Sequence, residues 1–331
     1  MRMFYPAIAC VAAMICAGAI GADVIGTVSA AASRVAPGSV IPQDILLRPN
    51  GNREPKMGTP AAPEDTMRLA QVDEEEEVSS TGNPSVAPLK WVGVLRNPTP
   101  TTKDPSLYSY CTGQFITPSV VLTAGHCLND LDTNTVYDLS KQTFILQYQN
   151  GVGSHTFKTL CGATSPQWAY PSNLSSMTGP QKAAAQITAH QHDFAMILMD
   201  GKSPTGVMPY ALDWKGNVSK AVRIGYAIDV LNGEIVQQAR GAVFFADEIA
   251  LFAPQSLPNL AVHWAAITNL TQGVSGGAWI SHFSTTEGAN KNVMVAVTSF
   301  NDPNYPGAVF GAYLTAAEFN PLLTFVSNGC K

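Results

Sequence analysis

Three short stretches of the sequence carry residue types that can perform nucleophilic catalysis together. VLTAGHC contains His126, HDFAMIL contains Asp193, and TQGVSGGAWI contains Ser275. A serine hydroxyl is a weak nucleophile at neutral pH and needs an adjacent base. An imidazole titrates near that pH and can accept the proton, and a carboxylate can hold the imidazole in the right tautomer. The three residue types therefore predict acyl-transfer chemistry at a Ser–His–Asp triad.

Each stretch also has an ordinary structural interpretation. A serine in a glycine-rich turn is usually a turn residue, a histidine beside a cysteine is usually packed, and an aspartate before an apolar run can protect a strand edge. The triad is favoured because all three occur together and in order. Asp193 is preferred over other aspartates because its apolar neighbours would bury it, and a buried carboxylate needs a partner. Those other aspartates are Asp130, Asp132, Asp138 and Asp200.

The glycines around Ser275 predict a second part of the site. In the stretch GVSGG at 273–277 they allow a tight turn that aims backbone N–H groups inward. The N–H groups of Gly273 and Ser275 are expected to form an oxyanion hole. The pattern also fits the G-x-S-x-G elbow of α/β-hydrolases, which needs an acid and then a histidine after the serine. Only His282 follows, ahead of every downstream carboxylate, so this alternative is rejected.

Two further histidines, His190 and His192, precede Asp193. Alternate histidines on a strand share a face and could bind a metal ion, but no third ligand is evident nearby. They are therefore interpreted as ordinary loop or strand-edge residues, and no metal site is expected. The predicted chemistry requires no organic cofactor either.

The elements that would carry these residues are short strands. From Leu89 onward the sequence consists of short β-branched or aromatic runs separated by Gly, Pro, Asn and Asp. Many short strands with turn signals are typical of an all-β sandwich or a pair of barrels. Helix signals come late: Thr315 and Glu318 fit a capping box, and Asn320-Pro321 fits an N-cap followed by proline. Two short helical turns or a broken helix are expected to close the domain.

The first 86 residues differ from this pattern. Residues 1–22 combine Arg2 with a short apolar run and small residues, as a secretory signal peptide does. The run is shorter than the roughly 20 apolar residues that usually span a bilayer, which disfavours a membrane anchor. Residues 23–86 are rich in Pro, Gly, Ala and Ser and predict a low-complexity acidic linker or pro-segment. The mature protein is expected to be secreted, without stable membrane association.

Charge and cysteine content narrow the expected partners and compartment. The net charge is −5, and much of the acidity lies in the leader. The sequence has no basic patch, so nucleic acid is not an expected partner. Four cysteines follow the signal peptide, and an even number in an exported protein favours disulfides, with three pairings open. They are Cys111, Cys127, Cys161 and Cys330.

Together these stretches resemble the chymotrypsin-like (trypsin-like) serine peptidase family, closer to its bacterial secreted and glutamyl-endopeptidase-like members. TAGHC matches the T-A-[AG]-H-C motif around the family's catalytic histidine, DFAM matches D-[IF]-A-[ML], and GVSGG matches G-x-S-G-G. The chain order His–Asp–Ser also matches. The resemblance covers roughly residues 87–331 and implies His126, Asp193 and Ser275 as the catalytic triad.

The resemblance implies a fold and an activity. The fold is all-β, with two packed antiparallel six-stranded β-barrels at roughly 87–205 and 206–314 and a short C-terminal helix. The activity is that of a secreted serine endopeptidase, which hydrolyses polypeptide substrates through an acyl-enzyme at Ser275. The family's cysteine pattern implies a Cys111–Cys127 disulfide, which leaves Cys161–Cys330 as the second pair.

Substrate-binding residues follow from the same resemblance. Asn269, Leu270 and Gln272 precede the nucleophile and are expected to line the primary specificity pocket. Asn269 stands where an aspartate would give a preference for Arg or Lys. A small or medium, uncharged residue is therefore expected before the scissile bond. The strand expected to pair with the substrate backbone contains Ser299, Phe300 and Asn301.

One departure from the family pattern concerns activation. Many members carry an aspartate immediately before the nucleophile, where it pairs with the new N-terminal ammonium after activation cleavage. Here that residue is Val274, so this ion pair cannot form. The departure motivates an alternative function, a non-catalytic binding protein on the same fold.

Overall fold

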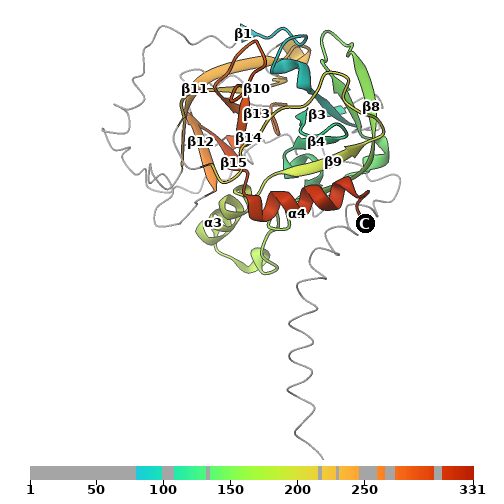
Figure 1. The fold of residues 1–331 in the computed structure, drawn as a ribbon. Coiled ribbons are helices and arrows are strands. Elements are labelled where there is room, and N and C mark those ends of the chain that lie inside the picture. The colour runs from blue at the N-terminus through green and yellow to red at the C-terminus, as the bar shows by residue number, and fades with distance from the viewer. Residues whose placement is uncertain are drawn as a thin grey trace, which may run out of the picture.

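The computed structural model describes residues 80–98, 108–131, 135–214, 218–228, 231–245, 259–264, 273–301 and 308–331. Within them the chain forms two closed antiparallel β-barrels, with two α-helices gathered at one end of the molecule (Figure 1). Each barrel has six strands, which confirms the predicted fold class. The predicted signal peptide and most of the predicted leader lie outside the described residues, as do Asn269, Leu270 and Gln272.

The first barrel closes in the strand order β2-β3-β4-β9-β8-β7. Its core holds Phe115, Phe144 and Phe157, whose ring centroids lie 5.2 to 6.4 Å apart. Because side chains alternate between the two faces of a strand, every second residue points into this core. The interior is therefore apolar and filled by aromatic rings. The strands are β2 (Val92–Pro98), β3 (Tyr108–Phe115), β4 (Val120–Thr123), β7 (Thr143–Leu146), β8 (His155–Thr164) and β9 (Ala195–Met199).

The second barrel follows the order β11-β10-β13-β14-β15-β12 and closes through a β11–β12 pairing. Its core surrounds Trp279 and includes Arg223 and His263, both fully buried. Burial, followed by the charge of Arg223, lowers the pKa of His263 to about 3, so the imidazole stays neutral at pH 7. The strands are β10 (Val218–Gly225), β11 (Gln237–Phe245), β12 (Leu260–Trp264), β13 (Ala278–Ser281), β14 (Val293–Asn301) and β15 (Ala308–Tyr313).

A short strand from the end of the predicted leader extends the second barrel. β1 (Ser80–Thr81) pairs antiparallel with β11. Beside it, the Gly82 N–H donates to the Val236 carbonyl at 2.9 Å. Residues 80–82 therefore pack with the second barrel, although they precede the predicted domain start at residue 87.

Helix α3 (Gly179–His190) was not among the predicted elements, although its first turn carries a recognisable signal. Thr178 and Gln181 form a capping box, in which the Thr178 N–H donates to the Gln181 side chain at 3.1 Å. Such a box supplies partners for N–H groups that the first helical turn leaves open. His190 ends this helix, so its predicted place in a loop or at a strand edge is wrong.

Helix α4 (Ala316–Ser327) is continuous, although two short turns or a broken helix were expected. Pro321 lies inside it and lacks the N–H that would complete one intrahelical hydrogen bond. Buried Phe319 and Leu322 belong to an apolar face of α4, which packs against β8 and β9 of the first barrel (Figure 1). This tertiary packing outweighs the cost of the proline.

Disulfides and short turns complete the fold. Cys111 pairs with Cys127, as the resemblance implies, and Cys161 in β8 pairs with Cys330 after α4, the pair that was left. Neither α-helix of the described part is long and apolar enough to cross a membrane. The remaining elements are a hairpin of β5 (Asn129–Asp130) and β6 (Thr135–Val136) and the 3-10 turns η2 (Leu89–Trp91), η3 (Gly125–Cys127), η4 (Leu139–Lys141), η5 (Leu174–Ser176) and η6 (Leu231–Gly233).

Candidate active site

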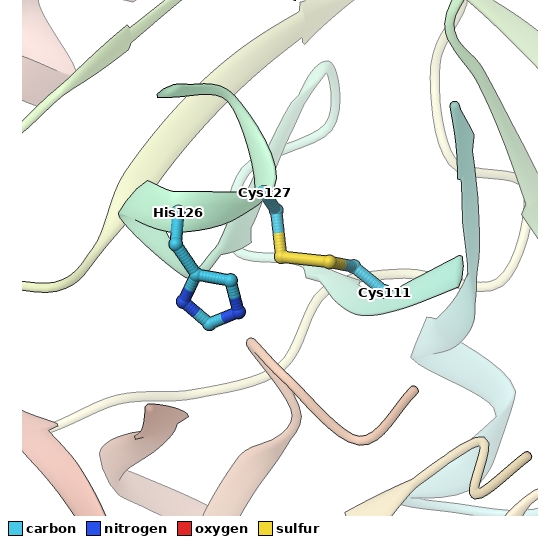
Figure 2. Close-up of side chains that lie close together, drawn as sticks. All are labelled: Cys111, His126 and Cys127. Atoms are coloured by element: carbon cyan, nitrogen blue, oxygen red, sulfur yellow. A yellow bond between two sulfur atoms is a disulfide. The ribbon is translucent and has the colours of Figure 1, made fainter. Parts of the chain in front are cut away.

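His126 lies on the turn η3, directly after β4. The Cys111–Cys127 disulfide ties this turn to β3, and the His126 ring projects beside it (Figure 2). One ring nitrogen and the two sulfur atoms lie within 4.8 Å of one another, a spacing that a metal site could also show. The sulfurs are joined to each other and offer no thiolate, which is the form of cysteine that binds metals. The cysteine pair therefore supports the turn and leaves the imidazole free for other chemistry.

Asp193 is fully buried and contacts His126 with both carboxylate oxygens. Oδ1 accepts the backbone N–H of His126 at 2.8 Å, and Oδ2 lies 2.7 Å from the ring Nδ1. An ionised carboxylate can only accept, so Nδ1 carries the proton and Nε2 is left as a base. Burial by itself would raise the pKa of Asp193, but the electrostatic attraction and hydrogen bonds of His126 and His190 hold that pKa well below its usual range.

Ser299 and His190 complete the surroundings of this carboxylate. The Ser299 hydroxyl donates to Asp193 Oδ2, and Nδ1 of His190 lies 2.9 Å from Ser299 Oγ and 3.7 Å from Asp193 Oδ2. Because the hydroxyl hydrogen goes to Asp193, Nδ1 of His190 must donate to Oγ. The His190 ring packs against Trp168 and Phe300, with centroids 5.2 and 4.3 Å away. Sequence reasoning placed neither Ser299 nor His190 on Asp193, and no local pattern marks them.

Ser275 lies in a turn that requires glycine at two positions. Gly273 and Gly276 have φ angles of 82° and 81°, in the left-handed region that side chains disfavour. A Cβ on Gly276 would also lie 2.5 Å from the backbone nitrogen of Ala124, closer than atoms can approach. The turn therefore presses directly against the end of β4, next to the residues that carry His126.

Thr112 of β3 joins this turn to the histidine side of the site. Its N–H donates to the Ser275 carbonyl at 2.8 Å, and its hydroxyl donates to the Gly273 carbonyl at 2.9 Å. The Ser275 carbonyl also lies 3.9 Å from Sγ of Cys127, the residue that follows His126. Two backbone segments from different barrels thus contact one another at the candidate nucleophile and base. No sequence pattern signalled the role of Thr112.

The two predicted oxyanion-hole donors belong to the same turn. Within the part of the chain that the structure describes, neither the N–H of Gly273 nor that of Ser275 donates to a protein acceptor. Val274 between them is 1% exposed and packs with Ala227 and Ala239. Val274 therefore offers apolar packing and no carboxylate at this position.

The predicted substrate-binding strand is the end of β14. Ser299 is buried with its hydroxyl on Asp193, so only its backbone remains for the predicted role. Phe300 is 8% exposed and stacks on Phe310 with a centroid distance of 4.7 Å. Asn301 ends the strand and is half-buried. The structure therefore describes three of the six residues predicted to bind the substrate, Ser299, Phe300 and Asn301.

Comparison with known proteins finds similarity in fold but no match by sequence. No protein-family model matches this sequence, and no curated protein matches it. Protease Anisep from Arthrobacter nicotinovorans is 18% identical with a TM-score of 0.52, over 77% of this chain and 100% of that structure. A Glu endopeptidase in complex with MPD is 19% identical with a TM-score of 0.52, over 78% and 99%. A mutant of human heparin binding protein (CAP37) is 13% identical with a TM-score of 0.50, over 76% and 96%.

These identities are low, so the similarity concerns the fold. The matched structures are covered almost completely, and the two closed barrels agree with them. The chain therefore has the fold of the chymotrypsin-like serine peptidases.

Proposed function

We propose that this chain is a serine endopeptidase with a His126/Asp193/Ser275 triad. The observation that carries the proposal is the fully buried Asp193 carboxylate, bound to the backbone N–H and to the ring Nδ1 of His126. Burying a carboxylate is unfavourable unless partners are placed around it, and the arrangement seen is the one that orients a catalytic imidazole. The hydrogen bonds from Thr112 to the Ser275 turn support the serine as the third member.

The proposed mechanism proceeds through an acyl-enzyme. His126 Nε2 takes the Ser275 proton as Oγ attacks the carbonyl carbon of the substrate, and Asp193 stabilises the imidazolium that forms. The N–H groups of Gly273 and Ser275 bind the oxyanion, a contribution of about 3 to 4 kcal/mol for each donor. The imidazolium then protonates the leaving amine, and water hydrolyses the ester by the same path in reverse. No metal or organic cofactor takes part in these steps.

The proposed substrate is a polypeptide bound in extended form along the end of β14. The backbone of Ser299, Phe300 and Asn301 would pair with it by β-augmentation. Asn269, Leu270 and Gln272 would line the primary pocket, with a preference for a small or medium, uncharged residue. Profiling against a peptide library checks this preference, and dominant cleavage after Arg or Lys would contradict it.

The proposed location is outside the cell, in the extracellular space or the periplasm. Two disulfides support an oxidising compartment. Residues 1–22 would be removed as a signal peptide, residues 23–86 would act as a linker or pro-segment, and residues 87–331 would form the peptidase domain. Because Val274 replaces the activating aspartate, activation would not use an N-terminal ammonium.

A non-catalytic binding protein on the same fold is the second candidate. The apolar packing of Val274 favours it, and the similar structure named for heparin binding carries the same fold. The Asp193–His126 arrangement argues against it, because binding alone requires no oriented imidazole. An unreactive purified chain would favour this second function.

The test is hydrolysis of an unfolded protein substrate by the purified secreted chain. Replacing Ser275 with Ala should lower the rate by about 10⁶-fold, to background. The matched control is Ser281→Ala, which removes another buried hydroxyl, on β13, without touching the triad. This control should retain activity within about twofold. Equal rates for the wild type and Ser275→Ala would refute the proposed function.

A further inference from the structure

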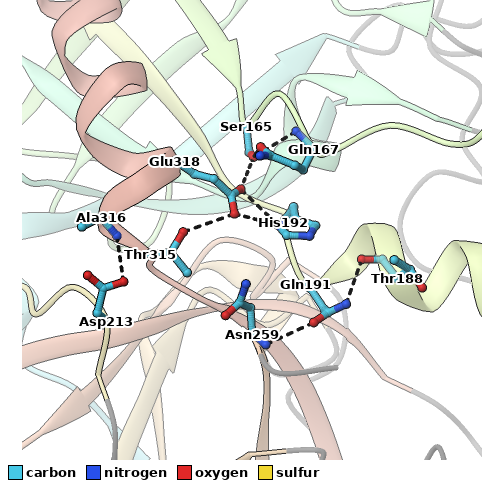
Figure 3. A network of polar contacts seen from close by, with 10 residues as sticks. All are labelled: Ser165, Gln167, Thr188, Gln191, His192, Asp213, Asn259, Thr315, Ala316 and Glu318. Carbon is cyan, nitrogen blue, oxygen red and sulfur yellow. Dashed lines mark hydrogen bonds and ion pairs between the residues drawn. The ribbon is translucent and has the colours of Figure 1, made fainter. Parts of the chain in front are cut away.

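A buried carboxylate on the C-terminal helix contacts the segment that carries Asp193. Glu318 of α4 is only 8% exposed and accepts hydrogen bonds from three side chains (Figure 3). Ser165 Oγ donates at 2.5 Å, Nδ1 of His192 lies 2.9 and 3.0 Å from the two carboxylate oxygens, and Thr315 Oγ1 donates at 3.2 Å. Burial by itself would raise the pKa of Glu318, but the bonds from His192 and Ser165 lower it on balance. Glu318 is therefore ionised at neutral pH.

These contacts reach Asp193 through the backbone. His192 directly precedes Asp193 in the chain. On the other side, the Ser165 N–H donates to the carbonyl of Phe194, the residue after Asp193, at 2.9 Å. Glu318 thus binds two residues, His192 and Ser165, that flank the Asp193 backbone from both directions. Its capping-box role expected from the sequence is not its main contact.

The neighbouring residue Gln191 adds a tie to the second barrel. Its side chain is 4% exposed and accepts the backbone N–H of Asn259 at 3.1 Å (Figure 3). That contact holds the start of the segment, and Glu318 holds its middle. Without Glu318, His192 would be left mostly buried without its carboxylate partner and would turn to find water.

The carboxylate of Asp193 must keep its orientation because both of its oxygens contact His126. Oδ1 must meet the backbone N–H of His126 and Oδ2 must meet its Nδ1, at 2.8 and 2.7 Å. A small rotation of the segment lengthens one of these bonds, and catalysis is sensitive to misplacement of about 1 Å. We propose that Glu318 is a positioning residue for the triad, acting through His192 to hold Asp193 against His126.

A purely structural role, docking of α4, is the alternative to test against. The helix is also held by its buried apolar face, by the Cys161–Cys330 disulfide, and by Asp213, whose side chain accepts the Ala316 N–H at 3.1 Å. Asp213 is therefore a matched control, since its carboxylate binds the first turn of the same helix. Within the described part of the chain, Asp213 makes no contact with the segment that carries Asp193 (Figure 3).

The kinetic test compares Glu318→Ala with Asp213→Ala in the full secreted chain, and it rests on the proposed peptidase function. Glu318→Ala should lower kcat at least about tenfold and leave KM within about twofold, because an interaction of the transition state is lost. Asp213→Ala should change both by less than about twofold. Equal kcat values for the two variants would overturn the proposal.

A conservative pair at His192 keeps the test valid if Glu318→Ala does not fold. His192→Asn retains an N–H donor near the position of Nδ1 and should keep most of kcat, whereas His192→Ala should lose about as much as Glu318→Ala. The double variant Glu318→Ala/His192→Ala should have a kcat no lower than that of either single variant, because the two residues act as one unit. Additive losses, or a defect in His192→Asn as large as in His192→Ala, would contradict the proposal.

A spectroscopic readout separates this proposal from the proposed function. The proton between His126 Nδ1 and Asp193 should give a low-field NMR signal that exchanges slowly with water in the wild type. In Glu318→Ala it should exchange at least about tenfold faster, and in Asp213→Ala it should not. This signal needs no turnover, so an inactive wild type would refute only the peptidase proposal. Unchanged exchange in Glu318→Ala would refute the positioning role.

Discussion

The two sides of the candidate site are held in place by different means. On the first-barrel side, His126 and Asp193 are positioned by side-chain contacts and by the Cys111–Cys127 disulfide beside them. On the second-barrel side, Ser275 is positioned by the backbone of a glycine turn that presses on β4 and accepts hydrogen bonds from Thr112. The position of His126 should therefore be lost when a partner side chain is removed. The position of Ser275 should be lost when an atom is added to the glycine turn.

Among the changes that compare the two sides, removing the carboxylate partner on the histidine side has the largest expected effect. Asp193→Asn keeps the shape but presents an amide that favours the wrong imidazole tautomer, so kcat should fall by about 10⁴-fold. Asp200→Asn is the control, since Asp200 is exposed and accepts only the Lys158 N–H at 2.9 Å among the described contacts. Steady-state kinetics check this, and a loss under tenfold in Asp193→Asn would remove the basis for the histidine side.

Adding one carbon on the serine side is expected to lower the stability of the fold. Gly276→Ala combines a positive φ with a Cβ that meets the Ala124 nitrogen at 2.5 Å, so it should lower the free energy of unfolding by about 2 to 5 kcal/mol. Gly151 has a similar φ of 84° but nothing within 4 Å of its Cβ position.

The Gly151→Ala control should therefore cost only the backbone strain, about 1 to 2 kcal/mol. Denaturant unfolding measures both variants. Equal losses would show that the turn does not press on β4, and the contrast between the two sides would then fail.

Removing the disulfide sharpens the description of the histidine side. The Cys111–Cys127 bridge spans a sequence separation of 16, for which loop entropy predicts a loss of about 3 kcal/mol when both cysteines become alanine. The bridge also fixes η3, which carries His126. The variant should therefore have a lower kcat than the wild type even at a temperature where it is fully folded. Thermal unfolding and kinetics together check this, and an unchanged kcat in the folded variant would mean that Asp193 alone positions His126.

The smallest effect concerns stability in acid. The pKa of Asp193 is held below its ordinary value of about 4, so as the pH falls the unfolded chain takes up this proton before the folded chain does. Its contribution to stability is therefore present above about pH 4 and is lost as the pH falls through the folded-state pKa. Between pH 7 and pH 3 the wild type should lose more free energy of unfolding than Asp193→Asn. Parallel pH profiles would show that the pKa of Asp193 is not lowered in the folded protein.

The strands could be predicted, and the candidate triad could be proposed, because both depend on local sequence patterns. Short β-branched runs predict strands, and TAGHC, DFAM and GVSGG each place a residue type next to its neighbours along the chain. Helix α3 carried a local signal too, the Thr178–Gln181 capping box, but its interior is rich in small residues and lacks a strong apolar face.

The residues that support the triad could not be predicted because their partners are distant in sequence. Ser299 meets Asp193 across 106 positions, and Thr112 meets Gly273 across 161. Glu318 matched a capping box locally, yet it also binds His192, 126 positions away. Continuous helix through Pro321 likewise depends on packing against the first barrel. Such contacts follow from how the barrels assemble, which single-sequence patterns do not contain.

Activation of Ser275 by His126 and Asp193 across the two barrels can be measured by covalent labelling. A fluorophosphonate probe added to the purified chain, followed by peptide mass spectrometry, should place one adduct on Ser275. Labelling should disappear in Ser275→Ala and fall strongly in Asp193→Asn, while Ser281→Ala labels as the wild type does. No adduct on the folded wild type, or an adduct that persists in Ser275→Ala, would show that His126 and Asp193 do not activate Ser275.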